Sequence, residues 1–140
     1  MLSDQLTAFG DMHEHAGFHA FQSMVASLSF RPEYYNANRE KLLGSGGVWG
    51  ALEGRIPTHL RFIEACLGHD IRPHLSDIAA PTLVIHAGED MITGPRTTMP
   101  LEEGLPNSVG VSMDRVAHVV AGKEEKIVFG KILFDFLNAH

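Results

Sequence analysis

Cysteine, basic residues and long apolar runs are scarce in this sequence of 140 residues, and each scarcity excludes a class of protein. The single cysteine, Cys66, rules out an internal disulfide and a cysteine-rich zinc site. It fits a protein of the reducing cytosol, so we expect a cytoplasmic location. No apolar run approaches the ~18 residues that a membrane-spanning helix needs. Residues 1–6 lack the basic start and apolar core of a signal peptide.

Basic residues are outnumbered by acidic ones. Eleven lysine and arginine residues stand against 17 aspartate and glutamate residues, which gives a formal net charge of −6 with histidine neutral. An acidic chain without a basic stripe does not attract nucleic-acid phosphates. Hydrophobic residues at 44% and charged residues at 20% are typical of a globular domain rather than of a disordered chain. We therefore expect neither nucleic acid nor a membrane as a partner.

The first half of the chain carries helical patterns. Apolar residues recur every three or four positions over 18–28 and again over 56–67, as on the buried face of a helix. Pro32 and Pro57 are placed to open helices, because proline suits the first helical turn. The glycine-rich stretch 44–50 breaks the pattern. These features predict several short helices and no strand.

The hydrophobic period changes in the second half. Residues 82–85 form a continuous apolar run, which is typical of a parallel strand that is buried on both faces. Residues 109–113 alternate in polarity and predict a strand with one wetter face. A helix near 97–103 between them suits a right-handed strand–helix–strand crossover. Residues 123–137 predict an amphipathic helix that covers the sheet. Its apolar face comprises Val128, Phe129, Ile132, Leu133, Phe136 and Leu137.

Two parallel strands are too few for an independent sheet. Both sheet edges and a large apolar face would stay uncovered. The final helix is also built to cover more sheet than this sequence supplies. We therefore expect the chain to form a homo-oligomer or to associate with a missing N-terminal half.

Asp90 and His118 are the residues best placed for chemistry. Asp90 follows the first strand after a turn of small residues, and His118 follows the second strand. The carboxyl ends of parallel strands share one sheet edge, where ligands and catalytic groups gather. We predict that the two side chains lie within hydrogen-bond reach. A carboxylate beside an imidazole fixes its tautomer and stabilises the cation that forms when it takes a proton.

Other interpretations of these residues stay open. Asp90 is alternatively a turn residue that bonds to its own backbone, as aspartate commonly does. Glu89 and Asp114 are weaker alternatives for the acid. His118 is alternatively a packed histidine with a structural hydrogen bond.

Three segments carry a resemblance to the α/β-hydrolase family, namely residues 78–85, residues 90–95 and Ala117-His118 with the closing helix. The resemblance covers roughly residues 55–140. It implies an α/β fold in which 71–140 are the C-terminal portion of the hydrolase sheet, with two parallel strands and flanking helices. It implies that residues 1–70 are the end of a helical cap, or lid.

The same resemblance implies a reaction. Asp90 would be the catalytic acid and His118 the general base in hydrolysis of a small-molecule ester, or of a related acyl, epoxide or carbon–halogen bond. No cofactor is implied. The chain departs from the family at Ala87 and at 115–117, where glycine often precedes the acid and the histidine.

The family's nucleophile has no counterpart in this sequence. It sits in Gly-x-Ser-x-Gly on a sharp strand-to-helix turn, and the nearest stretch, 43–47, has Leu43 in place of the first glycine. We interpret Ser45 as part of a flexible loop. The chain then carries an acid and a base without the group that forms the covalent intermediate, and we expect it to be inactive alone. A hypothesis of another class is a noncatalytic interaction module that pairs through its open sheet edge.

Histidines and large apolar residues complete the set of candidates. His15 and His19 have the spacing of helical zinc ligands, but Gly17 lies between them, so we interpret them and His13 as solvated and expect no metal site. The histidines at positions 59, 69, 74, 86 and 140 show no partner pattern. We expect three residues to line or border a substrate pocket. They are Trp49, Met91 and Val119.

Overall fold

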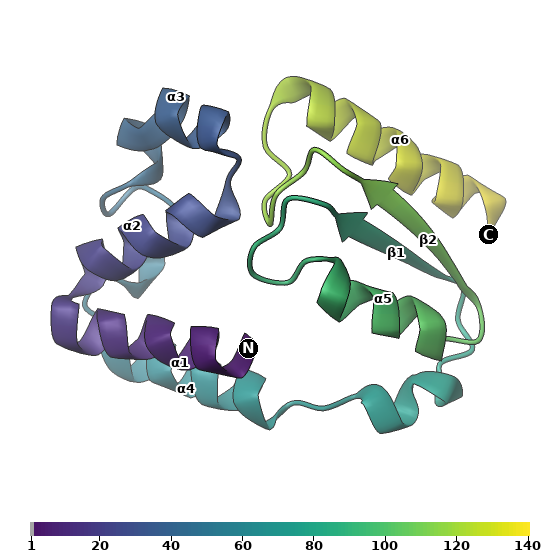
Figure 1. The fold of residues 1–140 in the computed structure, drawn as a ribbon, viewed down its shortest axis with the longest axis horizontal. Coiled ribbons are helices and arrows are strands. Elements are labelled where there is room, and N and C mark those ends of the chain that lie inside the picture. The colour runs from purple at the N-terminus through teal and green to yellow at the C-terminus, as the bar shows by residue number, and fades with distance from the viewer. Residues whose placement is uncertain (1) are drawn as a thin grey trace. The chain divides into compact units, whose positions relative to one another are not determined.

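The computed structural model describes residues 2–140, and the chain divides between His69 and Asp70 into two compact units. We call residues 2–69 the helical unit and residues 70–140 the sheet unit; Figure 1 shows their elements. Within the described residues, no helix combines the length and the apolar character that crossing a membrane requires.

The helical unit is built from helices alone, as the sequence predicts. Gly17, with φ of 88°, separates the first helical stretch from the second. Proline occupies the first turn of both α3 and α4. The elements are α1 (Leu2–Asp11), the π-helix η1 (Met12–Ala16), α2 (Phe18–Ser29), α3 (Pro32–Leu42), the 3₁₀-helix η2 (Gly50–Leu52) and α4 (Ile56–Gly68).

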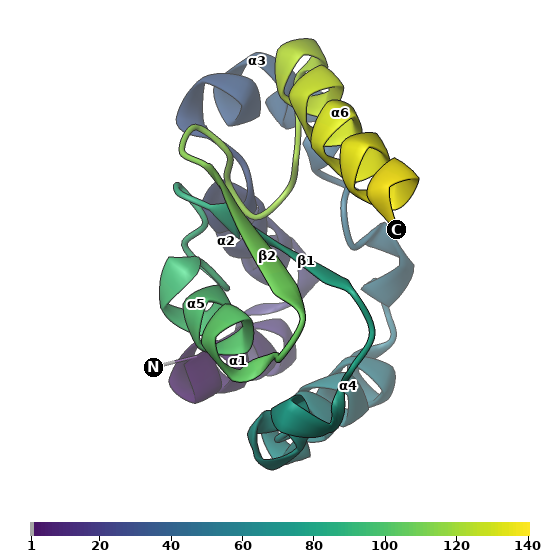
Figure 2. The same cartoon turned by 90° about the vertical axis from the view of Figure 1, so that its right-hand side faces the viewer.

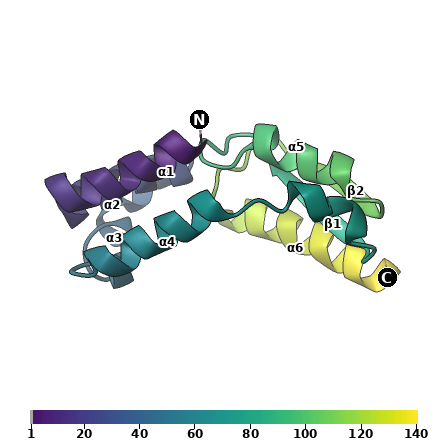
Figure 3. The same cartoon turned by 90° about the horizontal axis from the view of Figure 1, so that it is seen from below.

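Aromatic rings fill the core of the helical unit, where α1 lies beside α4 (Figures 1 and 3). Phe21 of α2 is 2% exposed, and its ring contacts those of Phe9 and Phe18. Burying a phenylalanine side chain contributes about 1.5–3 kcal/mol. The same core also holds polar side chains. These are His13, Gln22, Ser29 and His59.

The sheet unit has a strand–helix–strand crossover followed by a long helix. Its elements are the 3₁₀-helix η3 (Arg72–Asp77), β1 (Thr82–Ala87), α5 (Pro95–Gly104), β2 (Ser108–Met113) and α6 (Lys123–Ala139). The two strands pair in parallel, from Thr82 opposite Ser108 to Ala87 opposite Met113. Helices α5 and α6 lie on opposite faces of this sheet (Figures 2 and 3). The predicted sheet with two parallel strands and flanking helices is confirmed.

The face of the sheet under α5 is the better covered of the two. Val84 and His86 of β1 are both 7% exposed and lie on this face. A methyl group in place of the Gly110 hydrogen would collide with the Glu102 carboxylate of α5. Glycine in β2 therefore allows this carboxylate to lie against the sheet.

Helix α6 covers the other face of the sheet incompletely. No residue of α6 is buried. Phe129 and Phe136 are half-buried, whereas Val128 and Leu137 are 51% and 58% exposed. This agrees with the expectation that the helix is built to cover more sheet than this sequence supplies. Two strands form a surface too narrow to cover the whole apolar face of a helix.

Backbone groups of β1 point alternately toward β2 and away from it. The N–H of Thr82 donates to the backbone carbonyl of Asn107, and the N–H of Gly88 donates to that of Met113. In a parallel ladder of this register, the backbone groups of the even-numbered residues face β2. Those of Leu83, Ile85 and Ala87 therefore face the opposite edge of the strand.

Candidate functional site

Two loops meet beyond the carboxyl ends of β1 and β2. The N–H of Glu89 donates to the carbonyl of Val116 at 2.9 Å, and the N–H of Gly88 donates to that of Met113 at 3.0 Å. A Cβ atom at Gly88 would lie 2.6 Å from the carbonyl oxygen of Asp114. Only glycine lets the two loops approach this closely. The approach brings the residues after Gly88 beside those after Asp114.

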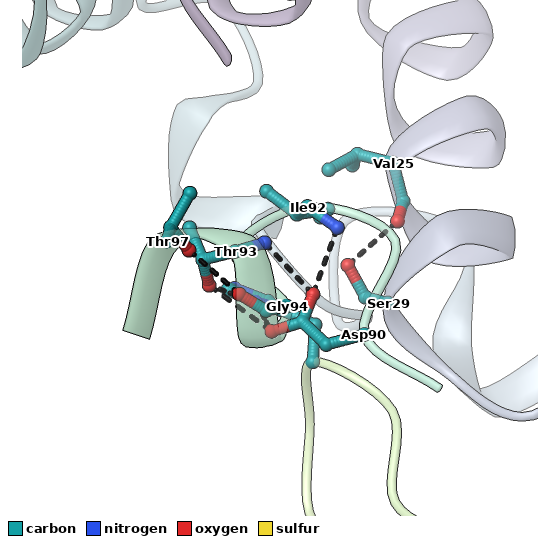
Figure 4. A network of polar contacts seen from close by, with 8 residues as sticks. Val25, Ser29, Asp90, Ile92, Thr93, Gly94 and Thr97 are labelled. Carbon is teal, nitrogen blue, oxygen red and sulfur yellow. Dashed lines mark hydrogen bonds and ion pairs between the residues drawn. The ribbon is translucent and has the colours of Figure 1, made fainter. Parts of the chain in front are cut away.

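Asp90 is held by its own turn. Its Oδ1 atom accepts the N–H of Ile92 at 2.8 Å and the N–H of Thr93 at 2.9 Å (Figure 4). The Asp90 side chain is 6% exposed. One carboxylate oxygen of Asp90 therefore bonds to the backbone of its own turn, as the alternative interpretation of this residue predicts.

The second oxygen of Asp90 faces His118. His118 Nδ1 lies 3.1 Å from Asp90 Oδ2, and the His118 side chain is 33% exposed. The structure thus brings the two predicted residues together; we call them the acid–histidine pair. With Nδ1 directed at the carboxylate, Nε2 is the ring nitrogen left for proton exchange.

The charge of Asp90 is set by opposing effects. Burial raises the pKa of its carboxyl, whereas the backbone N–H groups of Ile92 and Thr93 and the His118 side chain lower it. The lowering effects prevail, so the pKa of Asp90 lies below its usual range. Asp90 is therefore a carboxylate at neutral pH and stabilises a positive charge on His118.

The two alternative acids differ from Asp90 in their exposure to solvent. Glu89 and Asp114 are both exposed to solvent. Asp114 borders an open hollow of about 230 Å³ on the α5 face, which His86 and Glu102 also line. His118 contacts the carboxylate of Asp90, so the geometry favours Asp90 over both.

The predicted pocket residues are found in different settings. Met91 directly follows Asp90 and is 66% exposed. Val119 directly follows His118 and is half-buried. Trp49 belongs to the helical unit, where it has a left-handed conformation with φ of 55° just before η2. Their contact with a substrate stays a prediction.

Ser45 is exposed in a loop that is pinned rather than free. Gln22 Nε2 donates to the carbonyls of Gly44 and Val48, and the N–H of Gly44 donates to Gln22 Oε1. The loop follows α3, not a strand. It therefore has no resemblance to a strand-to-helix turn that presents a nucleophile.

His13, which the sequence predicts to be solvated, forms a buried pair with His59. His13 Nδ1 lies 2.9 Å from His59 Nδ1, and the two side chains are 1% and 7% exposed. The interpretation of His13 as solvated is therefore wrong, because the π-helix η1 turns it into the core. His15 and His19 are on the surface, on either side of Gly17. Within residues 2–140, no three His, Cys, Asp or Glu side chains are placed to hold a metal ion.

His86 of β1 joins the sheet to α5 through two hydrogen bonds. His86 Nε2 lies 2.7 Å from Glu102 Oε2, and His86 Nδ1 lies 2.8 Å from Thr98 Oγ1. Thr98 and Glu102 are one helical turn apart, so both reach the same strand position. A buried strand histidine followed by this helical spacing is the signal that sequence reasoning missed.

Solved structures share this fold. MGS-M2, an α/β-hydrolase enzyme from a Medee basin deep-sea metagenome library, matches with a TM-score of 0.81 and 21% identity, over 98% of this chain and 50% of that one. The enol-lactonase from Burkholderia xenovorans LB400 matches with 0.77 and 21%, over 96% and 50%. The esterase EaEST from Exiguobacterium antarcticum matches with 0.73 and 15%, over 97% and 48%. No protein-family model and no curated protein match the chain.

These matches define the class of fold. The chain has the fold of an α/β hydrolase, and the predicted fold class is confirmed. It spans about half the length of the solved structures that it matches. A chain of about half that length agrees with a sheet of only two strands, because the complete hydrolase fold has more strands.

Proposed function

We propose that this chain is the cap and the last core strands of a hydrolase that cleaves carboxylic esters, lactones included. The observation that carries the proposal is the contact between Asp90 and His118 at the shared end of two parallel strands. The hydrolase fold of the chain supports it. The activity itself needs a nucleophile from a segment outside this sequence.

The acid–histidine pair performs proton transfer in this proposal. His118 Nε2 takes the proton of the nucleophile as the nucleophile attacks the ester carbonyl. The Asp90 carboxylate, bonded to Nδ1, holds the imidazole in one tautomer and stabilises the imidazolium. The proton then passes from Nε2 to the leaving alkoxide, and the bond between carbonyl carbon and alcohol oxygen breaks. Water then attacks the acyl group while His118 Nε2 takes its proton; His118 returns that proton to the nucleophile as the bond between the acyl group and the nucleophile breaks and the carboxylic acid leaves.

The ester is favoured among the bonds that the sequence left open. Two of the solved structures with this fold are an enol-lactonase and an esterase. Both names describe cleavage of a carbonyl carbon–oxygen bond. Epoxides and carbon–halogen bonds have no such support.

An assay of the 140-residue chain is the first test. With p-nitrophenyl acetate we expect no turnover above the background, because the 140 residues contain no Gly-x-Ser-x-Gly to supply the nucleophile. Turnover that Ser45→Ala abolishes would instead assign the nucleophile to Ser45.

A chain extended by the upstream coding sequence is the second test. We expect that extension to encode Gly-x-Ser-x-Gly and to confer ester hydrolysis. Asp90→Asn then lowers kcat on the order of 10³–10⁴-fold, because the imidazole adopts the wrong tautomer. Glu89→Gln is the matched control and keeps the activity. An Asp90→Asn enzyme with full activity would contradict the proposal.

A noncatalytic interaction module is the second candidate function. The absence of Gly-x-Ser-x-Gly from the 140 residues and the edge of β1 that faces away from β2 favour it. An extended chain without a nucleophile motif, or with unchanged inactivity, would support the module over the enzyme.

A further inference from the structure

The Thr93 hydroxyl lies between the two members of the acid–histidine pair. Thr93 Oγ1 donates to Asp90 Oδ2 at 3.0 Å, and it lies 3.1 Å from His118 Nδ1. His118 Nδ1 lies 3.1 Å from Asp90 Oδ2. The three groups therefore form a closed triangle of contacts.

The donor count at Asp90 shows what the hydroxyl contributes. An ionised carboxylate accepts about four hydrogen bonds. Oδ1 receives the N–H groups of Ile92 and Thr93, and Oδ2 receives the Thr93 hydroxyl and the His118 ring. Thr93 supplies two of these four donors. Because the carboxylate is 6% exposed, a lost donor leaves a buried lone pair without a partner.

The proton count fixes the direction of the third contact. A threonine hydroxyl has one hydrogen to donate, and the carboxylate of Asp90 can only accept. His118 Nδ1 therefore carries the ring proton in its hydrogen bond to Asp90 Oδ2. With the Thr93 hydrogen directed at Asp90, Thr93 Oγ1 accepts from the same Nδ1–H. The Nδ1 proton of His118 is then shared between Asp90 Oδ2 and Thr93 Oγ1.

Resting on the proposed function, we propose that Thr93 is a positioning residue of the acid–histidine pair. Its hydroxyl holds Asp90 Oδ2 toward His118 and accepts part of the Nδ1 proton, so the imidazole presents Nε2 in one orientation. Thr93 acts through Asp90 and His118 and does not itself touch the reacting atoms.

The surroundings of Thr93 suit this role. Its side chain is β-branched and has few allowed rotamers. The next residue, Gly94, opens α5 and accepts hydrogen bonds from the N–H and the hydroxyl of Thr97. The start of the helix therefore fixes the backbone that carries the Thr93 hydroxyl.

Nuclear magnetic resonance of the 140-residue chain tests the proposal without any activity. The Thr93→Val variant keeps the shape of the side chain and removes the hydroxyl, whereas Thr93→Ser keeps the hydroxyl. The ¹³C signal of the Asp90 carboxyl reports its titration, and the ¹⁵N signals of His118 report its tautomer. Thr97→Val is the matched control, because it removes a hydroxyl from the same turn but not from the pair.

The expected result separates positioning from folding. In Thr93→Val, the titration midpoint of Asp90 moves to higher pH and the ¹⁵N signals of His118 move toward a mixture of tautomers. Thr93→Ser and Thr97→Val retain the wild-type signals. If valine disturbs the fold, as shown by lost dispersion of the amide signals, Thr93→Ala is measured in its place.

Two results would overturn the proposal. One is an Asp90 titration and a His118 spectrum that stay unchanged without the hydroxyl. The other is an equal change in Thr97→Val, which would indicate a general effect on the turn.

The failure of this inference is distinguishable from that of the proposed function. In an active extended chain, Thr93→Val is expected to lower kcat about tenfold and to leave KM unchanged. An extended chain that is inactive throughout, with the spectra as expected, would remove the enzyme and keep the positioning role. An active extended chain in which Thr93→Val changes neither kcat nor the spectra would keep the enzyme and remove the positioning role.

Discussion

At the scale of single residues, every buried side-chain nitrogen and oxygen of the described residues has a hydrogen-bond partner. Gln22 satisfies three backbone groups of the glycine-rich loop, and His13 is matched by His59. Each match avoids the cost of about 1–3 kcal/mol for a buried polar group without a partner. The buried pair of His13 and His59 tolerates little change in its protonation.

The histidine pair makes the stability of the helical unit depend on pH. Burial lowers the pKa of His13; burial and the charge of His13 lower that of His59. The unfolded chain then binds more protons than the folded one, so stability is complete above about pH 6.5 and falls as the pH decreases below it. The expected slope reaches about 1.4 kcal/mol per pH unit for each proton. Two protonated rings would also repel each other, because their Nδ1 atoms are only 2.9 Å apart.

Urea unfolding between about pH 5 and pH 7 tests this dependence. Trp49, the only tryptophan, lies in the helical unit and reports its unfolding by fluorescence. The double variant His13→Leu and His59→Leu is expected to flatten the pH dependence, because neither ring is left without its partner. His15→Gln is the exposed control. A pH profile that is equally steep in the double variant would disprove the account.

At the scale of elements, two glycines are expected to respond oppositely to the same change. Gly110→Ala displaces the Glu102 carboxylate and breaks its bond to His86, which costs about 1–3 kcal/mol. Gly130→Ala, in α6 with open space around the new methyl, stabilises by about 0.5–1 kcal/mol. Urea unfolding monitored by circular dichroism measures both. Equal effects of the two substitutions would contradict the steric explanation.

The elements themselves were largely predictable from the sequence. Pro32, Pro57 and Gly17 mark helix boundaries by their own chemistry, and the two strands have a clear hydrophobic pattern. The contact of Asp90 with His118 follows from the shared ends of parallel strands.

Other features depend on long-range packing and carry no periodic signal. His13 and His59 are 46 positions apart and meet only when α1 and α4 pack. The role of Thr93 depends on the course of one turn.

At the scale of the whole molecule, apolar surface remains exposed on α6. Ile127, Phe134 and Leu137 are 62%, 64% and 58% exposed, and their spacing places them on one side of the helix. Contiguous apolar surface of this kind favours association. We expect a mass above 15.3 kDa in sedimentation velocity, rising with concentration.

A charge on this side of α6 is expected to oppose association. Phe134→Lys shifts the chain toward the monomer, because a lysine on a contact surface must give up its hydration. Phe62→Lys is the matched control in the helical unit, where Phe62 is 59% exposed. A wild-type chain that stays monomeric at every concentration would contradict the prediction.

The alternating backbone of β1 gives any strand that joins it a readable signature. Amides of Val84 and His86 are already bonded in the ladder with β2, whereas those of Leu83, Ile85 and Ala87 face the other edge. In deuterated solvent the chain should therefore exchange every second amide of β1 quickly. An added strand would slow those amides and leave their neighbours as they were.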